Sequence, residues 1–98
     1  MLEWYDKKGN KIELEDRNRI ELEDKEYFRV DETTLPDGKW VSTVWLGLNH
    51  NHGDGPPLIF ETMVFPSEGN FNELDCERYS TEEEAKLGHE EMVKKWSE

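Results

Sequence analysis

The sequence has a single cysteine, few basic side chains and no long apolar run among its 98 residues. Because Cys76 stands alone, no disulfide can form within the chain, and nothing suggests a secreted disulfide scaffold. No stretch approaches the ~18 apolar residues that cross a bilayer. The N-terminal residues also lack the basic start and apolar middle of a signal peptide. We therefore expect a soluble, intracellular protein that does not bind membranes.

Positive charge is scarce, because 12 Lys and Arg stand against 24 Asp and Glu, a formal net charge of −12. Without a basic stripe that could replace counterions, the chain is not expected to bind nucleic acid. The acidic surplus fits either of two roles. It mimics nucleic acid toward a basic protein, or it keeps a small domain soluble. Solubility is the commoner reason for runs of charge.

Motifs for nucleophilic catalysis and for phosphate binding are missing. The chain contains neither G-x-S-x-G nor G-x-x-x-x-G-K. Cys76 precedes an acidic segment, which raises rather than lowers the pKa of a thiol. The sequence therefore gives no support to an enzyme that works through a side-chain nucleophile.

The hydrophobic residues, 34% of the chain, are gathered in periodic runs that suit a single domain over residues 1–98 with one modest core. The runs predict a hairpin over 2–14 with its turn at Gly9-Asn10, a short exposed helix within 15–26, strands at 27–35, 40–48 and 58–65, a short edge strand at 76–79, and a helix over 80–96. The turn residues Pro36 and Gly38 join the first two long strands as antiparallel neighbours.

The C-terminal helix has the clearest signals. Ser80 or Thr81 caps it, and Glu83 or Glu84 completes a capping box. One stripe at helical spacing is formed by Ala85, His89, Met92 and Trp96. Gly88 lies beside this stripe and would let the helix approach a sheet closely.

These elements predict an α+β fold: an antiparallel sheet of four or five strands with the C-terminal helix packed on one face. The strands at 40–48 and 58–65 are apolar on both faces, so the second face of the sheet also needs cover. Either the N-terminal segment covers it, or two copies associate as a homodimer.

The segment NHNHGDGPP, residues 49–57, is a candidate recognition loop because it is long for a hairpin connection and stiffened by Pro56 and Pro57. Its candidate binding residues are His50, His52 and Asp54, with the neighbouring Trp45 as an apolar contact. Alternatively the loop is a wide turn that only covers the end of the sheet. A divalent metal such as zinc is a further alternative, with His50, His52 and His89 as ligands.

Glu61 and His89 are the remaining candidates. Glu61 shares a strand face with Ile59, Met63 and Phe65, so its carboxylate needs a partner, either His89 or a neighbouring hydroxyl. Such a Glu–His pair suits acid–base chemistry, but it also suits fold specification, which is commoner. His89 itself is either a ligand contact or, more commonly, a partly buried histidine that bonds a strand residue.

The runs WVSTVWLGLNHNHGDGPPLIFETMVF and ERYSTEEEAKLGHEEMV, with the opening WYDKKGNKI, resemble a family of small uncharacterised bacteriophage proteins. The resemblance covers residues 1–96 and implies a phage origin and action in the host cytoplasm. It implies no activity. The family pattern often has an aromatic residue at the position of His52, which weighs against a two-histidine metal site.

Two hypotheses of function follow. The first is a binding protein without turnover that sequesters or blocks a host component. A host protein is favoured over a nucleotide signal, which would need a basic spot at Arg29 or Arg78. The second is a small metal-assisted hydrolase that uses His50, His52, Asp54, Glu61 and His89. No cofactor is expected under the first hypothesis.

Overall fold

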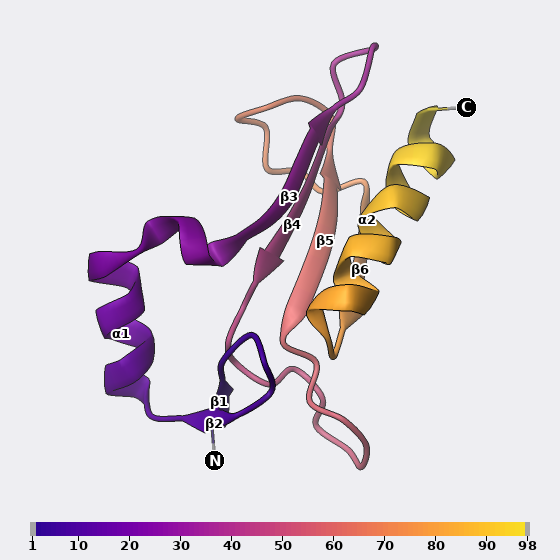
Figure 1. Ribbon diagram of the computed structural model, residues 1–98. Coiled ribbons are helices and arrows are strands. Elements are labelled where there is room, and N and C mark those ends of the chain that lie inside the picture. The colour runs from indigo at the N-terminus through magenta and orange to yellow at the C-terminus, as the bar shows by residue number, and fades with distance from the viewer. Residues whose placement is uncertain (1, 98) are drawn as a thin grey trace.

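The main sheet has four antiparallel strands in the order β3-β4-β5-β6, in a computed structural model that describes residues 2–97 (Figure 1). The strands are β3 Arg29–Thr34, β4 Trp40–Trp45, β5 Phe60–Phe65 and β6 Asp75–Tyr79. Each strand pairs with the next along the chain, as the alternating apolar patterns predict. The predicted α+β class and the short edge strand are thereby confirmed.

The three long strands are each shorter than predicted, and β5 begins at Phe60 where a start at residue 58 was predicted. The segment Lys25–Phe28, written η1, is a 3-10 turn that leads into β3. β4 ends at Trp45 because Gly47 has a φ of 78°, and a Cβ at that position would lie 2.9 Å from the Trp45 ring. The backbone therefore turns out of the sheet at Gly47, where a continuous strand through Leu48 was predicted.

The C-terminal helix α2, Glu82–Ser97, packs across one face of the sheet (Figure 1). Its buried residues are Ala85, Gly88, His89 and Met92, so the predicted stripe is confirmed in the main. Two adjoining clusters form the core: Leu35, Val41, Val64 and Met92, and Trp45, Ile59, Phe60 and Ala85. Thr81 and Glu84 close the predicted capping box through backbone N–H bonds of 3.2 and 3.1 Å.

The N-terminal segment does not cover the second face of the sheet. Strands β1 Trp4–Tyr5 and β2 Lys11–Ile12 and helix α1 Leu14–Glu23 gather beyond the end of the sheet at which β4 finishes (Figure 1). They pack on Trp45, whose indole N–H donates to the Tyr5 carbonyl at 3.0 Å. The predicted hairpin and short helix are confirmed, whereas the alternative in which the N-terminal segment covers the second face is wrong. Lys25 and Phe28 of η1 lie at the margin of that face.

None of the helices within residues 2–97 has the length and apolarity required to span a bilayer.

Candidate binding surface on the open face of the sheet

The face of the sheet opposite α2, here called the open face, arises from the alternation of side chains along the strands, which one bulge between Arg29 and Asp31 interrupts in β3. Residues that point toward α2, such as Val41, Thr43 and Val64, are fully buried. Their neighbours point the other way. By register, the open face consists of Arg29, Glu32 and Thr34 of β3, Trp40, Ser42 and Val44 of β4, Glu61, Met63 and Phe65 of β5, and Cys76 and Arg78 of β6.

Apolar side chains on the open face follow the two central strands. The apolar strip is defined as Trp40, Ser42, Val44, Met63 and Phe65 together with Phe71 from the loop after β5. Trp40 and Phe65 lie 5.4 Å apart between ring centroids, and Phe71 meets Phe65 edge-on at 5.6 Å. The Phe71 side chain is nonetheless 73% exposed. A hollow of ≈ 170 Å³ lies along this strip. Phe65 is buried at 7% exposed and Trp40 is half-buried, so Phe71 is the aromatic side chain of the strip that faces solvent most fully.

Glu61 is the one buried acid of this face, and its partner is Arg78. The Arg78 Nε donates to the Glu61 carboxylate at 2.9 Å, and Glu61 is only 6% exposed. The expectation that Glu61 pairs with His89 or a hydroxyl is wrong. Glu61 points to the open face, whereas His89 belongs to α2 and is buried against the opposite face. The pair stands directly across β5 and β6 in register, so it is a cross-strand ion pair.

His50 and Cys76 lie near the same pair, whose charges act on the pKa of both. Burial lowers the pKa of His50, and the positive charge of Arg78 lowers it further against the opposing effect of Glu61. Burial and the carboxylate of Glu61 raise the pKa of the Cys76 thiol to about 11. The thiol is therefore protonated at neutral pH and is a poor nucleophile.

His89 is a satisfied core residue, as the commoner interpretation of the sequence holds. Its Nδ1 lies 2.7 Å from the Thr43 hydroxyl and its Nε2 lies 2.9 Å from the Thr33 hydroxyl. Thr43 also bonds Thr62 at 2.5 Å. The imidazole is 2% exposed and Trp45 is 1% exposed, so two of the predicted binding residues are inaccessible to a ligand.

The 49–57 loop is held by its own asparagines. Asn49 Oδ1 accepts hydrogen bonds from the backbone N–H groups of Asn51 and Leu58 at 2.8 and 3.0 Å. Asn51 accepts from the Gly53 N–H and donates to the carbonyls of Asp54 and Pro56. These bonds span the loop and stiffen it. His52 and Asp54 remain exposed on its surface.

The proposed metal ligands do not come together. Within residues 2–97, no group of three or more His, Cys, Asp or Glu side chains is arranged to hold a metal ion. His50 and His52 belong to the loop, whereas both ring nitrogens of His89 already face threonine hydroxyls in the core. The geometry therefore gives the hydrolase hypothesis no assembled site.

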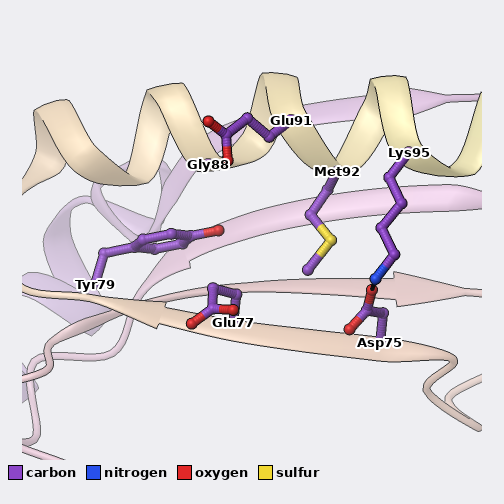
Figure 2. A pocket seen from close by; sticks show the side chains of 7 residues that line it. All are labelled: Asp75, Glu77, Tyr79, Gly88, Glu91, Met92 and Lys95. Carbon is purple, nitrogen blue, oxygen red and sulfur yellow. Dashed lines mark hydrogen bonds and ion pairs between the residues drawn. The ribbon is translucent and has the colours of Figure 1, made fainter.

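A second hollow, of ≈ 340 Å³, lies between β6 and α2 and was not predicted (Figure 2). Its lining residues are Asp75, Glu77, Tyr79, Gly88, Glu91, Met92 and Lys95. At one end the Lys95 ammonium bonds the Asp75 carboxylate at 2.7 Å. The Tyr79 side chain reaches beneath Gly88, where a Cβ would lie 2.2 Å from its hydroxyl oxygen. The lining of the hollow thus includes both the close Tyr79–Gly88 contact and the Lys95–Asp75 ion pair.

Comparisons with protein-family models, curated proteins and solved structures give no match for this chain. The site must therefore be judged on its own geometry. Trp40 and Phe71 were not singled out from the sequence as residues that reach the surface, although the apolar character of both faces of β4 and β5 was a visible signal.

Proposed function

We propose that this chain is a protein-binding domain that acts without catalytic turnover and docks its partner on the open face of the sheet. The supporting observation is the apolar strip, in which the buried Phe65 ring contacts both the half-buried Trp40 and the exposed Phe71. Aromatic residues at the centre of a surface with charged residues at its rim are typical of protein interfaces. The resemblance to small phage proteins suggests a host protein that is sequestered or blocked in the host cytoplasm.

The charges of the molecule favour a protein partner over a nucleotide. Arg29 and Arg78, the basic residues of this face, are each paired with a carboxylate, at 3.1 Å from Glu32 and 2.9 Å from Glu61. A phosphate would have to break these pairs within a chain of net charge −12. A basic protein, in contrast, would be attracted by the acidic surroundings and held by the apolar strip.

The test compares two variants with the parent chain. Phe71→Ser removes an exposed aromatic from the strip, whereas Leu87→Ser removes a comparably exposed apolar side chain from α2, on the other side of the sheet. Each of the three proteins is immobilised on a support and exposed to bacterial lysate. Any lysate protein retained in stoichiometric amount is purified, and its affinity for each of the three is measured. We expect the parent and Leu87→Ser to bind equally and Phe71→Ser to bind at least tenfold more weakly. A partner that binds all three equally, or no partner at all, would contradict the proposal.

A further inference from the structure

We infer that the occupant of the open face is a single amphipathic α-helix of the partner, lying along the central strands with its N-terminus toward the loop that carries Phe71. This inference rests on the proposed function and names the form of the partner. It draws on the width of the apolar strip, its area and the distribution of charge around it.

The width of the strip fits one helix. The larger apolar side chains of the strands lie on β4 and β5, with Phe28 of η1 at one margin. The flanking strands present Arg29, Glu32 and Arg78 together with the smaller Thr34 and Cys76. Two neighbouring strands cover about 10 Å, because strands lie ~4.8 Å apart, and this matches the diameter of about 10 Å of a helix. A second sheet would need apolar residues on all four strands. A second sheet packed on this face would instead bury the charged side chains of the flanking strands.

The area of the strip argues against a stable dimer of the chain. Six-residue strands extend about 20 Å at ~3.3 Å per residue. The strip therefore measures on the order of 200 Å², against roughly 800 Å² per partner in a standard protein interface. A helix of about 14 residues has the same length of about 20 Å. The strip thus matches a short helical segment and falls well short of the contact that a homodimer requires.

Charge is graded along the strip. At one end Arg29, Val44, Glu61 and Arg78 stand in a single row across the sheet. At the other end the Trp40–Phe65 pair adjoins the 66–74 loop, which contains Glu68 and Glu73 and no basic residue. Within the part of the chain described, neither of these two glutamates forms an ion pair.

A bound helix complements this gradient in one direction. The N-terminus of a helix carries roughly +0.5 elementary charge and the C-terminus roughly −0.5. With its N-terminus over Glu68 and Glu73, its C-terminus faces the opposite row, where Arg29 and Arg78 are balanced by Glu32 and Glu61. The gradient therefore runs from balanced charge at this row to acidic charge at the loop. Basic residues in the first turn of the partner helix would strengthen the same orientation.

The experiment uses a displayed library of 18-residue helical peptides with varied apolar positions and varied charge in the first and last turns. It is selected in parallel against the parent chain and against the double variant Glu68→Lys/Glu73→Lys. Both substituted positions are exposed, so folding should be preserved, and a thermal melt checks this. A second library of the same composition, with proline at two central positions, cannot form the helix.

From the parent we expect peptides with apolar residues at i, i+3, i+4 and i+7 and with Lys or Arg in the first turn. The double variant should instead enrich Glu or Asp there. Phe71→Ser should weaken the selected peptides at least tenfold and Leu87→Ser should leave them unchanged. Binders from the proline library, an unchanged end-charge preference, or no helical binder at all would overturn the inference.

Failure here is distinguishable from failure of the proposed function. Peptides that depend on Phe71 but show no helical spacing would leave docking on the open face intact and refute only the helix. Sedimentation equilibrium of the parent and of Phe71→Ser adds a separate outcome. A parent dimer that the substitution dissociates would assign the strip to a second copy and would overturn the inference.

Discussion

At the scale of single residues, the buried imidazole of His89 links the fold to pH. Both of its ring nitrogens face threonine hydroxyls, and burial lowers its pKa while the negative charge of Asp31, 3.8 Å away, partly opposes this. In the unfolded chain a histidine titrates near ~6.5. Between that pH and the lower folded pKa, the unfolded chain binds more protons than the folded one. Folding stability therefore falls as the pH falls through this window.

We accordingly predict that the free energy of unfolding is highest above pH ~6.5 and decreases below it, by up to about 1.4 kcal/mol per pH unit for one proton. His89→Gln should flatten this slope, although it lowers stability at pH 7.5 because the threonine network is disturbed. His52→Gln is the matched control, since it removes an imidazole from the exposed surface of the 49–57 loop, outside the core. Urea titrations from pH 5 to 8 provide the measurement. A slope that survives His89→Gln would show that His89 is not its source.

The partner of Glu61 was mispredicted for a reason that also lies at the level of single residues. Residue spacing correctly placed Glu61, Met63 and Phe65 on one face of a strand. Residue spacing within a strand does not reveal which face of the sheet a helix covers. In this protein α2 packs on the face that contains Thr43 and Thr62. The partner of Glu61 therefore came from the next strand, and that choice depends on register.

At the scale of elements, most of the fold could be predicted because local signals agreed. The capping box of α2, the apolar runs of β4 and β5 and the turn at Gly38, with a φ of 95°, each specify one structure. The position of the N-terminal segment could not be predicted. A hydrophobic pattern indicates which face of a helix is buried, but it does not indicate which element that face packs against. The place of the segment around Trp45 is decided by long-range packing.

Contact between α2 and β6 depends on Gly88. A Cβ at this position would lie 2.2 Å from the Tyr79 hydroxyl oxygen and 2.3 Å from two ring carbons. Overpacking of this kind costs about 1–3 kcal/mol, whereas alanine in a helix is about 1 kcal/mol better than glycine. We therefore predict that Gly88→Ala lowers the free energy of unfolding by up to about 2 kcal/mol.

A double-mutant cycle tests the cause of this loss. In a Tyr79→Ala background the obstructing ring is gone, so Gly88→Ala should become neutral or stabilising by up to about 1 kcal/mol. Denaturant titrations of the four proteins give the coupling energy. Equal costs in both backgrounds would contradict the assignment of the clash to Tyr79.

At the scale of the whole molecule, the formal charge of −12 on 98 residues is the dominant feature. Nine ion pairs join Lys or Arg side chains to carboxylates among the described residues, and most of these side chains are partly exposed. Exposed pairs contribute about 0–1 kcal/mol each. Repulsion among the many remaining carboxylates acts against the compact state. Added salt screens both effects, since the Debye length falls from ~30 Å at 0.01 M to ~8 Å at 0.15 M.

Because acidic residues outnumber basic ones by two to one, relief of repulsion should exceed the loss from screened ion pairs. We predict that the melting temperature rises as NaCl is increased from low to physiological concentration, as followed by circular dichroism. The control is Glu68→Lys/Glu73→Lys. Each substitution replaces a negative charge with a positive one and so raises the net charge by two, from −12 to −8 in total. Its melting temperature should rise less steeply with NaCl. A parent melting temperature that falls with NaCl would mean that the ion pairs stabilise the fold by more than the repulsion among carboxylates destabilises it. The negative electrostatic potential that should attract a basic partner would then be largely cancelled by the paired basic residues.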